Sequence, residues 1–211
     1  MSEFQLYCFA ESGNAYKAAL ALELAKCDWQ PIFVDFFKGE ARTDAFKKIN
    51  AMGEVPVLIH GDVKISQSGV IQNYIADLTG KFSGSTDEEC REIQRWVLWD
   101  NHKLSSQAGL LRFLMNFLPA DKRPEAVFPF MQGRLKAAYT VLNTHLENRE
   151  WVATDNPTMA DISCCGYLYY PEPFGFERTE WPNIDAWLDR ISQLDGWKHP
   201  YDLMQRGLPG A

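Results

Sequence analysis

The sequence predicts a mixed α/β unit over residues 1–79, followed by an all-helical domain over residues 88–211. The first stretch alternates short β-branched or aromatic runs with alanine- and leucine-rich segments, which is the pattern of strands joined by helices. After residue 88, apolar residues recur only at helical spacing. Residues 79–87 between them contain Gly80, Gly84 and several hydroxyl side chains, which indicates a linker.

The first unit is predicted to have the order β-α-β-α-β-β-α. A helix joins its first two strands, so these strands are expected to be parallel with a right-handed crossover, whereas the last two form a hairpin. The result is a small mixed sheet with helices on its faces. The predicted elements are strand 5–9, helix 15–26, strand 31–37, helix 43–49, strands 57–59 and 63–65, and a helix from residue 68 to 78.

The hairpin and the helix after it, residues 53–73, contain a candidate anion site. Val55 precedes a proline, which favours an extended backbone at that point. The last helix begins near Ser66, Gln67 and Ser68. Because the N–H groups at the start of a helix are unpaired and lie at the positive end of its dipole, they are expected to hold a carboxylate.

The second domain is predicted to be a bundle of helices. One long helix is expected over residues 88–117, followed by a break at 119–124 and helices at 129–148, 158–170 and 183–194. The helix at 158–170 is very apolar and is expected to lie at the centre of the domain. The tail after the last helix is expected to be irregular.

The composition argues against several classes of partner. A formal charge of −7 disfavours nucleic acid or an anionic membrane surface. No apolar run is long enough to span a bilayer, and the N-terminus lacks the features of a signal peptide, so a cytoplasmic location is expected. The five cysteines are odd in number and lack metal-ligand spacing, so reduced thiols and no metal site are expected.

Three short motifs connect the predicted elements with a known family. Gly53-Glu54-Val55-Pro56 lies within the run 46–58, Ile65-Ser66-Gln67-Ser68 begins the last helix of the first unit, and Asn156-Pro157-Thr158-Met159-Ala160-Asp161 begins the apolar helix. In this order and at these separations, they resemble the cis-proline strand, the Glu/Gln-Ser motif and the helix-capping motif of the cytosolic glutathione transferases. The resemblance covers nearly the whole chain. It implies a thioredoxin-like first domain and a helical second domain, of a bacterial type with serine or Nu-like features.

The resemblance implies that glutathione binds to the first domain. Gln67 and Ser68 would hold its γ-glutamyl carboxylate, in agreement with the anion site inferred from the helix start. Val55 would pair its backbone with the cysteinyl part of glutathione, and this pairing requires Pro56 to be cis.

One position departs from the pattern of the family. Many relatives have lysine or glutamine just before the Val-Pro pair, whereas this chain has Glu54. Its carboxylate would repel the glycyl carboxylate of glutathione. Lys38 or Arg42, in the loop after the second strand, would then supply the missing cation.

The chemistry of the family requires a thiolate at neutral pH, although a free thiol has a pKa of about 8.5. Ser12 lies where the first strand meets the first helix, and a hydroxyl there would stabilise the anion together with the helix dipole. The segment 10–17 also resembles the Nu-class pattern, in which an asparagine contributes, so Asn14 is the second candidate and Tyr7 the third. Ser12 and Asn14 are also preferred helix caps, so a purely structural role stays open. Cys8 falls inside the predicted strand and is expected to be an inert thiol.

A second substrate is expected between the two domains, and the resemblance implies a homodimer. In related proteins an acidic residue of the long helix reaches the glutathione of the neighbouring subunit, and Asp100 is the candidate for that role here. Six side chains are candidates for the walls of the second site: Phe9, Arg112, Phe113, Asn116, Phe117 and Tyr169.

The expected function is therefore that of a glutathione transferase, with glutathione as co-substrate and a small hydrophobic electrophile as second substrate. Such chemistry serves detoxification. Two alternatives stay open at this point. One is an enzyme of the same fold that uses glutathione to reduce disulfides or peroxides, and the other is a glutathione-binding interaction module without catalysis.

Overall fold

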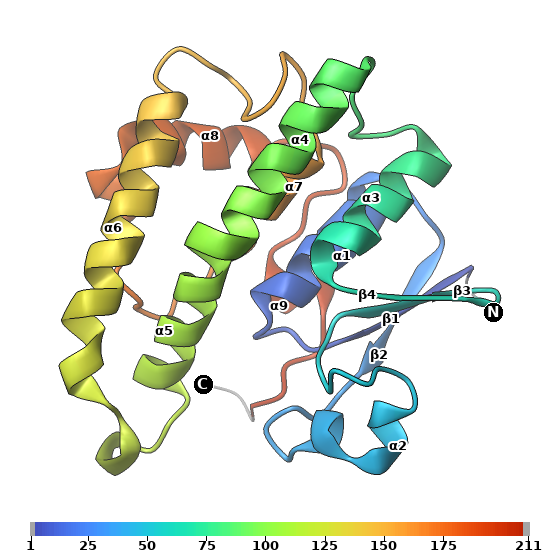
Figure 1. The fold of residues 1–211 in the computed structure, drawn as a ribbon, viewed down its shortest axis with the longest axis vertical. Coiled ribbons are helices and arrows are strands. Elements are labelled where there is room, and N and C mark those ends of the chain that lie inside the picture. Colours follow the sequence, from blue (N-terminus) through green and yellow to red (C-terminus); the bar gives the residue numbers. More distant parts are fainter. Residues whose placement is uncertain (1–2, 209–211) are drawn as a thin grey trace. The chain divides into compact units, whose positions relative to one another are not determined.

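The computed structural model describes residues 3–208, which form two compact units (Figure 1). Of the described residues, the first unit contains 3–83 and the C-terminal segment 194–208, and the second contains Gly84–Gln193. The C-terminal segment, which the sequence predicts as part of the helical domain, belongs to the first unit. Within residues 3–208, no helix is both long enough and apolar enough to cross a membrane.

The sheet of the first unit has four strands in the order β2-β1-β3-β4. β1 is parallel to β2, while β3 is antiparallel to both β1 and β4, which confirms the predicted mixed sheet. β2 begins two residues earlier than the predicted strand 31–37 and ends at Phe33, and it includes Pro31 as predicted. Because β2 is an edge strand, the missing N–H of this proline is tolerated. The strands are β1 (Phe4–Cys8), β2 (Trp29–Phe33), β3 (Val57–His60) and β4 (Val63–Ser66).

Helices cover both faces of this sheet. Figure 1 shows α1 (Gly13–Leu24) and α3 (Ser68–Thr79) on one face and the short α2 (Asp44–Lys47) on the other.

The C-terminal segment contacts the end of β1. Ala10, just after β1, donates a backbone hydrogen bond to the carbonyl of Gln205 (2.9 Å). The C-terminal segment also contains a short helix, α9 (Pro200–Leu203), so it is not wholly irregular as expected.

The second unit is helical, as predicted. The expected long helix is interrupted by a π-helical segment at Asp100–Ser105. The predicted helix at 158–170 ends at Cys164. The chain then continues in tight turns around Gly166, and these turns are also buried. The helices are α4 (Asp87–Trp99), α5 (Ser106–Asn116), α6 (Phe128–His145), α7 (Met159–Cys164) and α8 (Pro182–Ser192).

The centre of the helical unit is organised by a buried carboxylate at the start of α7. Thr158 and Asp161 form a capping box, as their spacing suggested. Asp161 also accepts hydrogen bonds from the backbone N–H of Val152 (2.8 Å) and from the indole of Trp187 (2.9 Å). One side chain therefore connects the start of α7 with the preceding loop and with α8.

Candidate functional site

Three strand ends meet at one edge of the sheet and define the candidate site. Tyr7 near the end of β1 pairs with Val57 at the start of β3, and Val57 pairs with Ser66 at the end of β4. β1 leads into α1 and β4 leads into α3, so both helices begin at this edge. The chain also enters β3 here. The register of the sheet thus brings together three segments that the sequence had singled out separately.

Ser12 is the N-cap residue of α1. Its Oγ accepts a hydrogen bond from the backbone N–H of Ala15 (3.2 Å), and the side chain is half-buried. A serine hydroxyl can donate one hydrogen bond while it accepts another. The cap therefore leaves the O–H of Ser12 available to a ligand, and the capping and ligand roles are compatible.

Asn14, the second residue of α1, contributes a buried oxygen. Within the described residues, its Oδ1 has no hydrogen-bond partner. A buried acceptor without a partner is costly, so an N–H group of a bound peptide would lower the free energy of this site. In this orientation Asn14 suits an amino or amide group, whereas the O–H of Ser12 suits an anionic sulfur.

Tyr7 and Cys8 belong to the two opposite faces of β1. Tyr7 packs edge-on against Phe46 of α2, with ring centroids 6.2 Å apart, on the face of the sheet away from α1. Cys8 is 1% exposed, and burial raises the pKa of its thiol to about 12. Cys8 is therefore a neutral thiol at physiological pH, and neither residue matches Ser12 as a group that activates sulfur.

The start of α3 has the properties of an anion site. Its N-cap residue, Gln67, makes no side-chain capping hydrogen bond, so the first N–H groups of the helix remain open. Gln67 also has a φ of 71°, which is unusual for a residue other than glycine, and such conformations concentrate at functional sites. Ser68, the next residue, is buried at 5% exposure. A carboxylate placed here would meet open N–H groups and a hydroxyl.

The entrance to β3 offers an open backbone. The bond between Val55 and Pro56 is cis, as the resemblance implied. Among residues 3–208, neither the N–H nor the C=O of Val55 has a hydrogen-bond partner. Glu54 is exposed, and its carbonyl accepts a hydrogen bond from Asn50 (2.8 Å). Val55 can therefore pair with an extended peptide as a strand would, with the carboxylate of Glu54 beside it.

Lys38 carries a positive charge in the loop after β2. Its side chain is 86% exposed and forms an ion pair with Asp35 (2.9 Å). This hydrogen-bonded ammonium lowers the pKa of the Asp35 carboxyl. Arg42, the other predicted cation, is exposed. Lys38 is accessible to a ligand, but a ligand carboxylate would have to compete with Asp35 for it.

In the helical unit, Asp100 has partners within its own unit. Its two carboxylate oxygens accept hydrogen bonds from Ser105 and Ser163, both at 2.7 Å, and its side chain is fully buried. A buried carboxylate with these partners is not presented to a neighbouring subunit. The buried position of Asp100 therefore does not fit its predicted role at the glutathione of a neighbouring subunit.

Two of the predicted wall residues, Arg112 and Asn116, contact the segment that follows α7. Arg112 pairs with Glu172 (2.7 Å), and its guanidinium lies 3.8 Å from the ring centroid of Tyr170. Asn116 donates to the carbonyl of Pro173 (2.9 Å). These contacts hold the end of α5 against the segment that follows α7.

One residue of the site was not predicted. Glu11, immediately before Ser12, has a fully buried side chain that accepts a hydrogen bond from the backbone N–H of Gly207 (2.9 Å). Its position next to Ser12 marks it in the sequence as a residue near the site, but the sequence does not indicate its partner Gly207, which lies 196 residues away.

Among the residues that the structure describes, no cluster of three or more His, Cys, Asp or Glu side chains could hold a metal ion.

Family models match both units of the chain. The model of the glutathione S-transferase N-terminal domain matches residues 2–77, and the model of the C-terminal domain matches residues 105–195. The chain belongs to the glutathione S-transferase family. The cis-proline, the open start of α3 and the capped start of α1 are thus found in a chain of the family that the sequence motifs resembled.

Similar proteins come from plants and bacteria. Glutathione S-transferase F10 of Arabidopsis thaliana is 29% identical over 203 residues, which cover 88% of this chain and 90% of that protein. The disulfide-bond oxidoreductase YfcG of Escherichia coli is 27% identical, with 87% of each chain covered. A crystal structure described as a possible glutathione S-transferase from Rhodopseudomonas palustris is 28% identical, with a TM-score of 0.88 over 95% of this chain and 90% of that chain. Because these glutathione S-transferases and this oxidoreductase match similarly well, the subgroup stays a prediction.

Proposed function

We propose that this glutathione transferase binds glutathione along the edge of the sheet where β1, β3 and β4 meet. The observation that carries the proposal is the convergence there of the Ser12 hydroxyl, the open backbone of Val55 and the uncapped start of α3. These three features match the thiol, the cysteinyl backbone and the γ-glutamyl carboxylate of one tripeptide. Gln67 and Ser68 bind the carboxylate end, next to the N–H groups of α3.

Ser12 stabilises the sulfur as a thiolate in this proposal. Its hydroxyl donates a hydrogen bond to the anion, and the start of α1 adds the positive end of a helix dipole, so both favour loss of the thiol proton to solvent. The sulfur lone pair then forms a carbon–sulfur bond with a small hydrophobic electrophile, whose leaving group departs with the electron pair of the broken bond. Asn14 positions the peptide beside Ser12. The contribution of the protein is the orientation of the peptide and the stabilisation of charge.

The cation for the glycyl carboxylate is assigned to Lys38. Support comes from its exposed position in the loop after β2, which is part of the same unit. The negative charge of Glu54 opposes this end of the ligand. We therefore expect weaker binding at the glycyl end than at the γ-glutamyl end.

The proposal is tested by retention on immobilised glutathione, followed by an assay of conjugation. Purified protein is expected to bind the column, to be eluted by free glutathione, and to conjugate a chloronitrobenzene with saturation in glutathione. Absence of retention together with absence of turnover would contradict the proposal.

A second candidate activity is the reduction of disulfides, since the E. coli relative is named a disulfide-bond oxidoreductase. It is tested by an assay with a mixed disulfide as substrate. In the reduction of a mixed disulfide between glutathione and a substrate thiol, the thiolate of a second glutathione would attack the glutathione sulfur. The new sulfur–sulfur bond gives oxidised glutathione, and the substrate departs as a thiolate that takes up a proton. With Cys8 buried and neutral, this exchange would rely on the thiolate of glutathione rather than on that cysteine. Turnover of the disulfide without conjugation would favour this activity over transfer.

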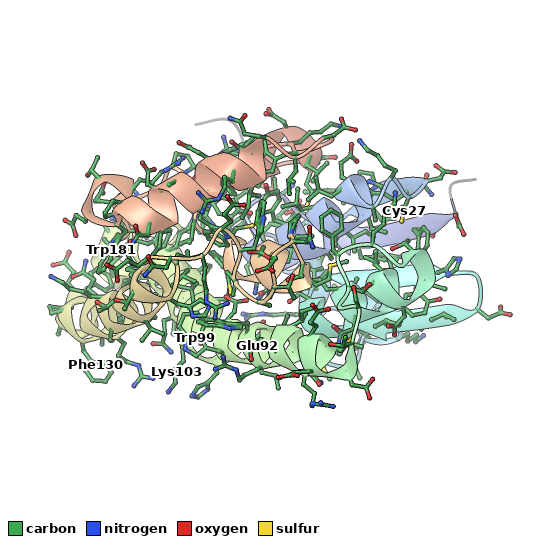
Figure 2. The ribbon with its side chains drawn as sticks, turned by 90° about the horizontal axis from the view of Figure 1, so that it is seen from above. Cys27, Glu92, Trp99, Lys103, Phe130 and Trp181 are labelled. Atoms are coloured by element: carbon green, nitrogen blue, oxygen red, sulfur yellow. The ribbon has the colours of Figure 1, made fainter. Side chains whose placement is uncertain are left out.

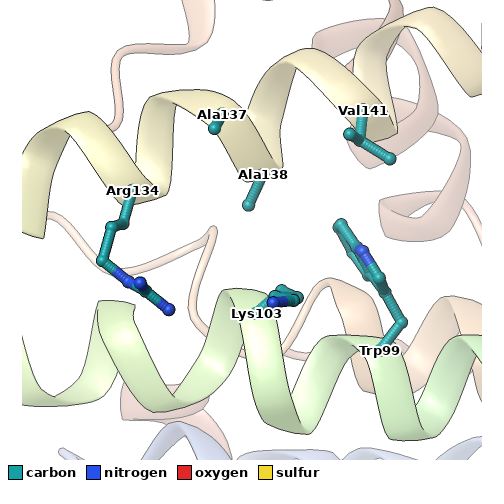
Figure 3. Close-up of a pocket in the computed structure, with 6 residues that line it drawn as sticks. All are labelled: Trp99, Lys103, Arg134, Ala137, Ala138 and Val141. Atoms are coloured by element: carbon teal, nitrogen blue, oxygen red, sulfur yellow. The ribbon is translucent and has the colours of Figure 1, made fainter.

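A homodimer is part of the proposal, and exposed apolar side chains on α4 and α6 support it. Leu98 is 62% exposed and Val141 is 49% exposed. Trp99 and Val141 face each other across a hollow of about 290 Å³ between α4 and α6, with Lys103 and Arg134 beside them (Figure 3). Trp99, Lys103 and Phe130 lie along one margin of the helical unit (Figure 2). A second copy would remove this apolar surface from water.

Replacing Val141 by aspartate is expected to convert the dimer into a monomer, because a charge would have to be buried at the contact. The oligomeric state of each protein is determined from the molar mass, measured by light scattering across a range of concentrations. Thr179→Asp, which adds the same charge at an exposed turn before α8, is the matched control and should remain dimeric. A wild-type protein that is monomeric at every concentration would refute the dimer.

The proposal also includes a role in detoxification and a cytoplasmic location. Both are supported by membership of the glutathione S-transferase family.

A further inference from the structure

We propose that Glu11 and Arg206 form a positioning pair that sets the acidity of the thiol bound at Ser12. Arg206 belongs to the segment Gln205–Leu208, called here the C-terminal strap. The inference rests on the proposed role of Ser12 in the glutathione site. It adds two residues from opposite ends of the chain, neither of which touches the sulfur in this scheme.

The strap holds the two residues that precede Ser12. Ala10 donates its backbone N–H to the carbonyl of Gln205 (2.9 Å). The Oε2 atom of Glu11 accepts from the N–H of Gly207 (2.9 Å), and its Oε1 atom lies 3.4 Å from both the N–H of Leu208 and the Nε of Arg206. The turn that carries the cap of α1 is therefore fastened by main-chain and side-chain contacts.

Other contacts of the first unit hold the strap in place. The guanidinium of Arg206 lies 4.1 Å from the ring centroid of Tyr201 in α9. A methyl group on Gly207 would lie 3.0 Å from the ring of Phe37, so the backbone passes close to this ring. The hydroxyl of Tyr16 in α1 donates to the carbonyl of Lys198 (2.9 Å). The strap is thus packed against α9, the loop after β2 and the two residues that precede the cap of α1.

The charge of Glu11 gives these contacts a chemical consequence. Its side chain is fully buried, and a buried carboxylate is tolerated only with compensating donors. It also lies one residue from Ser12, where the proposed reaction needs a second anion. Like charges raise the pKa of an acid. Without Arg206, the carboxylate of Glu11 would oppose formation of the thiolate, and with Arg206 this repulsion is offset.

Two substitutions should therefore shift the pKa of enzyme-bound glutathione in opposite directions. Arg206→Met removes the positive charge of Arg206 from beside the carboxylate and is expected to raise the thiol pKa by about one unit. Glu11→Gln removes the anion, retains an acceptor for Gly207 and leaves the cation, so it is expected to lower that pKa. The double variant Glu11→Gln/Arg206→Met should return close to the wild-type value. Arg206→Lys keeps the charge and should also stay close to wild type.

The experiment titrates the ultraviolet absorbance of bound thiolate in the full-length protein and measures kcat/KM against pH. For Arg206→Met we expect kcat/KM to fall about tenfold below the thiol pKa and to recover at higher pH. Arg178→Met is the matched control, because Arg178 forms ion pairs with Asp185 and Asp189 in the helical unit. It should lower thermal stability without moving the thiol pKa.

The possible outcomes separate this inference from the proposed function. Shifts of opposite sign in the two single variants, cancelled in the double variant, would support the pair. An unchanged pKa in Glu11→Gln, the nearly isosteric variant, would overturn it, even if Arg206→Met did not fold. If Ser12→Ala moved the thiol pKa in that same experiment, the role of Ser12 would stand and only the role of the strap would fail. If wild-type protein bound no glutathione, both would fail.

Discussion

Replacing Ser12 by alanine is expected to lower kcat/KM for conjugation about 100-fold, a loss comparable to removing one donor aimed at a developing anion. The same variant should raise the pKa of enzyme-bound glutathione towards the value of about 8.5 for a free thiol. The reason is that the O–H left available by the cap would no longer stabilise the thiolate. The measurement is a pH titration of bound thiolate absorbance, together with steady-state kinetics.

The loss of a helix cap must be separated from the loss of a donor to sulfur. Removing the cap of α1 should cost about 1 kcal/mol of stability. Thr86→Ala is the matched control, because Thr86 caps α4 in the same way by accepting from the N–H of Glu89 (3.2 Å). This control should lose similar stability and keep the wild-type thiol pKa. If Ser12→Ala behaved like Thr86→Ala, and Asn14→Ala moved the pKa instead, then Asn14 would be the activating residue.

Replacing Asp161 by alanine is expected to destabilise the protein by about 4 kcal/mol. Asp161 is 1% exposed, and its oxygens accept from the N–H groups of Val152 and Thr158 (2.8 Å each), the hydroxyl of Thr158 (3.1 Å) and the indole of Trp187 (2.9 Å). Alanine would leave these buried donors without an acceptor and would also open a cavity. Urea unfolding followed by tryptophan fluorescence measures the change in the free energy of unfolding.

An exposed aspartate nearby in the sequence provides the control for this experiment. Asp155 is exposed, and Asp155→Ala should change the free energy of unfolding by about 0.5 kcal/mol or less. A loss of less than about 1 kcal/mol in Asp161→Ala would contradict the central position of this carboxylate. Glutathione retention measured on any folded fraction should be unchanged, because Asp161 belongs to the helical unit rather than to the sheet edge.

The elements that depend on neighbouring residues were predictable. Ser12, Ser68 and Thr158 mark helix starts because caps and first turns are determined within a few positions. The hairpin of β3 and β4 follows from alternation around a two-residue turn. Lengths were less certain. The apolar run 158–170 resembles one helix, but tight turns bury its second half equally well, so hydrophobicity could not mark where α7 ends.

The candidate site was predicted as separate segments, and its assembly required the sheet register. Motifs indicated Val55, Gln67 and Ser68, and the cap indicated Ser12. The pairing of Tyr7 with Val57, and of Val57 with Ser66, is what brings these segments to one edge. The same register placed the side chain of Tyr7 on the α2 face, which local alternation alone could not assign to one side or the other.

By itself, the sequence determined the two-part architecture, the order of the elements and the places where helices begin, because each depends on contacts between residues close in the chain. Only the tertiary structure decided which carboxylates are buried and which groups donate hydrogen bonds to them. Glu11 meets Gly207 at a separation of 196 residues, and Asp100 meets Ser163 at a separation of 63. Burial and long-range pairing are properties of the packed chain. The residues next to Glu11 or Asp100 in the sequence therefore do not indicate that Gly207 or Ser163 will be the hydrogen-bond donor.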